Sequence, residues 1–259
     1  MRIRIASLLV MICGLLATTQ VFASTSDIEA AIMDKNYEQA RELAAKFLKT
    51  STDTRESAQA QYYLGLSQLR LGKCVDARAA FQTVMSTTSL PAGQAGSPDL
   101  YDRAALGMIE ALYNPGFYTD ALKEAERLLK RSPHSSFLSL IYLKIARTHL
   151  KLTHWQQARE YLQKIINDFP QSMEAPIAQN LLEEKEFFTV QVGSFLDDNK
   201  AIQLVEDLKA KGQYVYMVET TSQGKKFYRV RVGQMTSLSD AQTLEAKLVQ
   251  SGYPTLIYP

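Results

Sequence analysis

The 259-residue chain is longer than a typical single domain, so we expect two domains, or a repeat array followed by a small domain. Apolar residues make up 46% of the chain and charged residues 22%, a composition that excludes an intrinsically disordered protein. The formal charge of +2 argues against a partner held mainly through phosphates, and two cysteines are too few for a disulfide framework or a four-cysteine zinc site.

Residues 1–23 have the three-part pattern of a secretory signal. Two arginines precede an uncharged apolar run over residues 5–17, and compact residues end the segment at Ala23. We expect cleavage after Ala23 and an exported soluble protein. A retained membrane anchor is the alternative, although a span needs about 20 apolar residues and this run is shorter. A lipoprotein would be modified at Cys13, but the bulky Ile12 stands before it.

Residues 24–185 contain a repeated pattern of paired helices. Two stretches align with small or large residues at the same offsets: Ala77 with Ala158, Gly65 with Ala146, Phe81 with Leu162, and Val84 with Ile165. Small residues let two antiparallel helices approach closely, and large ones fill the groove between neighbouring pairs. Weaker copies surround Ala40 and Ala121, and residues 172–185 are expected to form a closing helix.

These residues resemble the tetratricopeptide repeat, whose period is about 34 residues. The key alanines Ala40, Ala77, Ala121 and Ala158 are 37, 44 and 37 residues apart, so the loops are longer than in the consensus. Trp155 opens the second helix of the last copy, where we expect it to pack between helices. The resemblance implies a scaffold that binds a protein partner, and no residue identifies that partner.

At Phe187 the apolar period changes from about 3.6 residues to about 2. Alternation predicts four strands and two intervening helices, the second capped by Ser239 with Gln242 completing a capping box. The order β-α-β-β-α-β predicts a split βαβ, ferredoxin-like domain with helices on one sheet face and the other face open. The whole chain is therefore expected to be α+β, with an all-α helical-hairpin solenoid first.

The segments FFTVQVGSF (187–195) and KKFYRVRVGQM (225–235) are similar to those of a SPOR domain. The resemblance covers residues 187–259. It departs from the family at Gln234-Met235, where many members have proline and an aromatic residue. It implies binding of peptidoglycan strands from which the stem peptides have been removed, which are enriched at the division septum, and therefore a periplasmic protein.

The candidate glycan site lies on the open face of the predicted sheet, where alternation and the resemblance together indicate five contacts: Gln191, Ser194, Phe227, Arg229 and Arg231. Glutamine offers a donor and an acceptor to hydroxyl and acetamido groups. Phenylalanine covers the apolar face of a sugar ring, and arginine pairs with the lactyl carboxylate that stem-peptide removal exposes. No catalytic residue or cofactor is expected. His149 and His154 are five residues apart, do not share a helical face, and predict no metal site.

We therefore expect a non-enzymatic peptidoglycan-binding protein whose array binds an envelope protein, in cell division or envelope maintenance, with no membrane span after signal removal. One alternative is an accessory or activator of a glycan-cleaving enzyme. Another is nucleic acid, because RNA-recognition modules share this topology. Residues 187–259 oppose it, since eight lysines and arginines nearly balance seven acidic residues and the third strand lacks paired aromatics.

Overall fold

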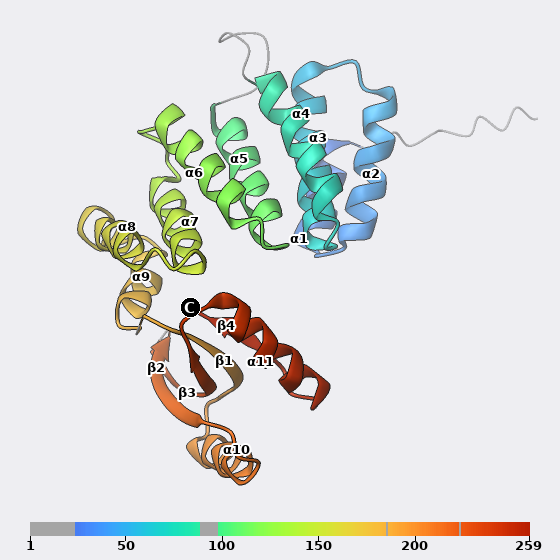
Figure 1. Cartoon of the computed structure of the whole chain (residues 1–259). Helices are drawn as coiled ribbons and strands as arrows, with labels where there is room; N and C mark the ends of the chain where they lie inside the picture. Colours follow the sequence, from blue (N-terminus) through green and yellow to red (C-terminus); the bar gives the residue numbers. More distant parts are fainter. Residues whose placement is uncertain (1–23, 89–97, 185, 223) are drawn as a thin grey trace, which may run out of the picture.

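The computed structural model describes residues 24–88, 98–184, 186–222 and 224–259, so the predicted signal sequence lies outside the described residues. Within these ranges the chain forms nine helices and then a four-stranded sheet with two further helices, arranged as in Figure 1. The predicted fold class, an all-α solenoid followed by a β-α-β-β-α-β unit, is confirmed. None of the described helices is both long enough and apolar enough to cross a bilayer.

The solenoid is a row of antiparallel helices in which each helix packs on the next one along the chain. The helices are α1 (Thr25–Met33), α2 (Tyr37–Thr50), α3 (Thr54–Arg70), α4 (Cys74–Thr88), α5 (Pro98–Tyr113), α6 (Tyr118–Arg131), α7 (Leu138–Lys151), α8 (Trp155–Asp168) and α9 (Ala175–Leu182). The four predicted copies are the successive pairs from α1–α2 to α7–α8, and α9 closes the row. The key alanines of all four copies are fully buried.

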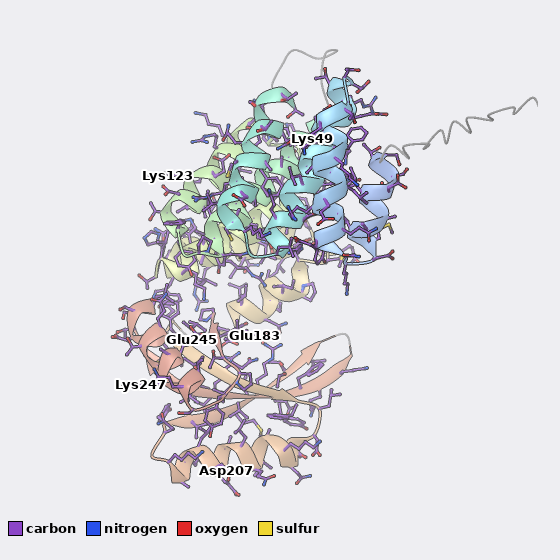
Figure 2. All side chains as sticks on the ribbon, turned by 90° about the vertical axis from the view of Figure 1, so that its right-hand side faces the viewer. Lys49, Lys123, Glu183, Asp207, Glu245 and Lys247 are labelled. Carbon is purple, nitrogen blue, oxygen red and sulfur yellow. The ribbon has the colours of Figure 1, made fainter. Side chains whose placement is uncertain are left out.

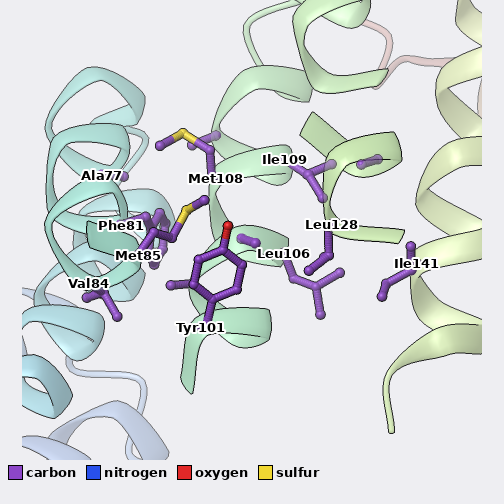
Figure 3. Close-up of a cluster of buried hydrophobic side chains, with 14 of the residues drawn as sticks. Ala77, Phe81, Val84, Met85, Tyr101, Leu106, Met108, Ile109, Leu128 and Ile141 are labelled. Atoms are coloured by element: carbon purple, nitrogen blue, oxygen red, sulfur yellow. The ribbon is translucent and has the colours of Figure 1, made fainter. Parts of the chain in front are cut away.

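The largest hydrophobic cluster of the solenoid extends from α3 to α7 (Figure 3). Phe81 of α4 is fully buried there. A Cβ atom at Gly65 of α3 would lie 2.8 Å from its ring, and one at Gly107 of α5 would lie closer still. Both helices approach the ring so closely that only a residue without a side chain fits at these two positions.

The second part of the chain is one antiparallel sheet in the order β2-β3-β1-β4. Its elements are β1 (Phe188–Phe195), α10 (Asp198–Ala210), β2 (Val215–Ser222), β3 (Lys225–Met235), α11 (Leu238–Gln250) and β4 (Leu256–Tyr258). Both helices pack on one face, where Val190, Val230 and Val232 meet Leu208 and Leu248. This core holds the sheet rigid beneath its other face.

The cap of α11 differs from the prediction, which placed Ser239 and Gln242 in a capping box. Ser237 is the N-cap, and its hydroxyl accepts a hydrogen bond from the Asp240 backbone N–H at 3.1 Å. The same hydroxyl donates to the Asp240 carboxylate at 2.7 Å. Ser237 is the cap because Asp240 stands three residues after it, where both its backbone N–H and its carboxylate bond the serine hydroxyl.

The two parts share a packed junction. The ring of Trp155 at the start of α8 lies 5.5 Å from that of Phe188 at the start of β1. The Lys151 ammonium at the end of α7 donates to the main-chain oxygens of Ile257 and Pro259 at 3.2 and 2.7 Å. Trp155 was expected to pack within the array, and it also joins the array to the sheet.

Gly107→Ala should destabilise the array, although alanine is the better helix former by about 1 kcal/mol. The added methyl group overlaps the buried Phe81 ring, and overpacking of this kind costs about 1–3 kcal/mol. Urea unfolding followed by circular dichroism measures the change, and adding Phe81→Leu should recover part of it. An increase in stability for Gly107→Ala alone would show that the crossing yields without cost.

Candidate functional site

The sheet face opposite α10 and α11, named here the outward face, carries the predicted site. Strand register places on it Thr189, Gln191, Ser194, Tyr216, Val218, Thr220, Phe227, Arg229, Arg231, Leu256 and Tyr258. Gln191 lies opposite Arg231, and Ser194 lies opposite Arg229. Phe227 lies next along β3, opposite Thr220. The structure thus brings all five predicted residues together on two neighbouring strands.

A β-bulge explains how Gln191 and Ser194, three residues apart, share this face. The register changes between Gln191 and Gly193, so β1 gains one residue relative to β3. Val192 is buried against the helices, and a Cβ at Gly193 would meet Leu204 of α10. Both residues therefore point inward and Ser194 points outward. Strict alternation would have turned Ser194 toward the core.

Four side chains of the outward face each hold a buried polar atom that has no hydrogen-bond partner among the described residues. These atoms are Gln191 Oε1, Thr220 Oγ1, Arg229 Nε and Arg231 Nε. They belong to three adjacent strands. A buried polar atom without a partner costs about 1–3 kcal/mol, so most native proteins avoid them. Arg231 is covered by the chain itself, so the other three atoms, on Gln191, Thr220 and Arg229, are the ones that a molecule outside the chain could satisfy.

Arg231 does not lie on an open face, which corrects the prediction for this residue. It is 1% exposed, and its guanidinium makes two hydrogen bonds to the Glu184 carboxylate, at 2.5 and 2.9 Å. It also stacks over the Tyr258 ring at 4.2 Å. The reason is that the chain just after α9 folds over this end of the sheet. Burial opposes the charge on Arg231, but the Glu184 carboxylate outweighs it and raises the arginine pKa.

Two hollows flank Arg229, which lines both. One, of about 400 Å³, lies between α9 and strands β2 and β3, with Tyr214 and Tyr216 in its wall. The other, of about 790 Å³, lies between the array, β4 and α11. Figure 2 labels Glu183 after α9 and Glu245 on α11 in this region, where the two parts of the chain meet. The exposed half of the outward face therefore continues into both hollows.

Burial at the junction shifts two pKa values away from their usual range. Desolvation raises the pKa of Tyr258, against the opposing charges of Arg231, Arg229 and Arg147. Desolvation also lowers the pKa of Lys151 to about 8, which the nearby Glu245 carboxylate partly counteracts. Arg147 of the array and Arg229 of the sheet line the same hollow as Tyr258.

His149 and His154 lie closer together than their spacing suggested. Helix α7 ends at Lys151, and the following turn brings the two Nδ1 atoms to 3.2 Å. One nitrogen must then carry a proton and the other accept it, and burial, with a smaller effect of His154, lowers the pKa of His149. Among the described residues, no three histidine, cysteine or acidic side chains form a group suited to a metal ion.

Several residues of this region were not predicted. Thr220 and Tyr216 follow from the alternation of β2, which would have placed them beside Phe227 and Arg231 had the strand been assigned a face. Glu184 and Arg147 carry no sequence signal for a role here. Their position depends on how the array packs against the sheet, and that packing has no local pattern.

Glu184→Gln should lower the free energy of unfolding by about 3 kcal/mol, because it leaves the buried Arg231 charge without a counter-charge. The neighbouring Glu183→Gln is the matched control. Glu183 is exposed, so its change should stay within about 0.5 kcal/mol. Trp155, the only tryptophan, lies at the junction and reports its opening by fluorescence during urea unfolding. Equal effects of the two variants would show that the ion pair contributes nothing.

Comparison with known proteins agrees with this architecture. A family model described as SPOR domain matches residues 184–258, and two described as tetratricopeptide repeat match residues 34–86 and 141–172. Aspartyl phosphate phosphatase F from Bacillus subtilis shares 18% identity at a TM-score of 0.55, over 72% of this chain and 49% of that one.

A second solved structure, YrrB, a TPR protein with an unusual peptide-binding site, shares 18% identity at a TM-score of 0.47, over 60% of this chain and 72% of that one. A search of the curated proteins found no significant match. At these identities the solved structures show likeness of fold alone. SPOR domains are peptidoglycan-binding modules and tetratricopeptide repeats are protein-interaction modules. The chain carries tetratricopeptide repeats within residues 34–172, followed by a C-terminal SPOR domain at residues 184–258.

Proposed function

We propose that this is an exported peptidoglycan-binding protein of the periplasm that acts in cell division or envelope maintenance. Residues 1–23 are its cleaved signal, residues 24–185 bind a protein partner, and residues 187–259 bind septal glycan strands lacking stem peptides. The observation that carries the proposal is the group of three unpartnered polar atoms, on Gln191, Thr220 and Arg229, on the outward face of the SPOR domain. The array and the sheet then work as one adaptor between cell wall and partner.

The chemistry of the outward face suits an acidic sugar polymer. Gln191 and Thr220 each hold a buried oxygen atom without a partner, which can accept a hydrogen bond from a sugar hydroxyl group once the side chain turns outward. The exposed Ser194 hydroxyl both donates and accepts. The half-buried Phe227 offers a ring surface to the apolar side of a sugar. Arg229 supplies positive charge for a lactyl carboxylate. Arg231, held by Glu184, positions the face and does not touch the glycan.

The array offers a separate hollow for a protein partner. It has a volume of about 310 Å³ and lies between α3, α5 and α7. Glu110 bonds Arg70 and Lys144 there at 3.1 and 3.2 Å, while Arg103 forms no ion pair among the described residues. Burial opposes the charge on Glu110, but the two cations outweigh it and lower the pKa. An apolar floor with surplus positive charge fits a peptide segment that carries a carboxylate.

The double variant Gln191→Ala, Ser194→Ala should weaken binding to amidase-treated sacculi by about 5–150-fold, because each lost hydrogen bond is worth about 0.5–1.5 kcal/mol. Folding should be unaffected, since both side chains lie outside the sheet core. Gln203→Ala on α10 is the control, the same chemical change at an exposed position on the helical side. Co-sedimentation measures binding. Unchanged binding by the double variant would place the glycan elsewhere.

Salt dependence should distinguish glycan from nucleic acid. Hydroxyl contacts and one or two arginine–carboxylate pairs are only mildly screened, so binding to sacculi should fall less than about tenfold between 50 and 200 mM salt. Contacts to six or more phosphates would reduce affinity by roughly 10³-fold over that range. Sedimentation at several salt concentrations gives the slope. A steep slope, or tighter binding to single-stranded RNA than to sacculi, would contradict the glycan assignment.

A further inference from the structure

The larger hollow beside Arg229 is walled by both parts of the chain. Its volume of about 790 Å³ lies within the range of small-ligand sites, about 300–1,000 Å³. The array contributes Tyr113, Tyr118 and Arg147, and α9 contributes Asn180. The opposite wall consists of Arg229, α11 and the outward side of β4. Neither part alone encloses this space, so the site is incomplete without the array.

Five charged or titrating side chains dominate the electrostatics of this hollow. The Lys151 ammonium already has hydrogen-bond partners, since it donates to the main-chain oxygens of Ile257 and Pro259. Glu245 acts on Lys151 and on Tyr118. Arg147 is exposed and forms no ion pair with any described side chain, and Arg229 holds a buried Nε without a partner. Both arginines line the hollow together with Tyr258. The available charge in the hollow is therefore positive and is supplied from both walls.

We propose that this hollow is a second half of the glycan site, in which Arg147 of the array and Arg229 of the sheet bind one carboxylate of the acidic sugar polymer. The inference rests on the proposed function. The proposed function gives glycan binding to the SPOR domain alone. Here the helical repeats also contact the glycan. The tyrosine rings and the amides of Asn114, Asn180 and Gln242 supply the stacking surfaces and hydrogen-bonding groups that sugars require.

Continuity with the outward face favours a polymer as the occupant. Four strands about 4.8 Å apart make a sheet only about 15 Å wide, so a glycan of several sugars must extend past an edge. Beyond β4 it enters this hollow, and Arg229 lines both the outward face and the hollow. An acidic peptide would satisfy the same charges but would not explain that continuity, and it becomes an outcome of the test.

The test uses the full mature chain and glycan strands stripped of stem peptides by amidase. Arg147→Ala should weaken binding about tenfold, the effect of losing one charge-assisted hydrogen-bonded pair. Arg55→Ala is the control, an equally exposed arginine at the start of α3, far along the array from the sheet. Glycan whose carboxylates are converted to amides tests whether Arg147 binds a carboxylate. On that glycan, wild type and Arg147→Ala should bind alike.

Each outcome decides a separate point. If Arg147→Ala binds like wild type while Gln191→Ala, Ser194→Ala binds weakly, the proposed function stands and the role of the array is overturned. If Arg147→Ala lowers binding equally on native and amidated glycan, the carboxylate contact is wrong. If wild type binds neither glycan, the proposed function itself fails. If an acidic peptide binds wild type but not Arg147→Ala, and glycan binding is the same with and without the peptide, the hollow belongs to the protein partner instead.

Discussion

A guanidinium removed from water must meet a carboxylate, and this requirement fixes how the two parts of the chain are joined. Arg231 lies in the middle of a strand at 1% exposure, and its carboxylate comes from Glu184, outside the sheet. The linking segment has to lie against the outward face for the pair to form. Tyr258 is packed beneath the guanidinium and also contacts a hydrophobic cluster formed by α7, α8 and α9. It thereby adds a second contact between the sheet and the array. The junction is thus a consequence of one buried charge.

That junction divides the outward face into two halves with different physical characters. In the half near α9, Glu184 covers Arg231 and satisfies its guanidinium except at Nε. The half around Gln191, Ser194 and Arg229 is accessible or leads into hollows, and it retains polar atoms that the chain does not satisfy. The bulge at Val192–Gly193 sets the boundary of the accessible half, because it turns Ser194 outward.

The sequence predicted the features that depend on local periodicity. Helix pairs followed from small residues at fixed offsets, strands followed from alternation, and their order was sufficient for the fold class. It placed Gln191 and Arg229 on one face for the same reason. It failed at Arg231 because exposure there depends on Glu184, and the packing of a linker is invisible to alternation. The Ser239 cap was wrong because Ser237 offered the same motif two residues earlier with a carboxylate as its partner.

The contacts of Lys151 and Trp155 at the junction fix the orientation of the array relative to the sheet. Two domains on a flexible tether would let a partner explore all directions around its anchor. Here three separate attachments, an ion pair, an ammonium and an aromatic pair, resist both bending and twisting between array and sheet. A glycan strand bound to the sheet would therefore determine the orientation of the whole solenoid. A protein bound to the array would then have one fixed orientation relative to the cell wall.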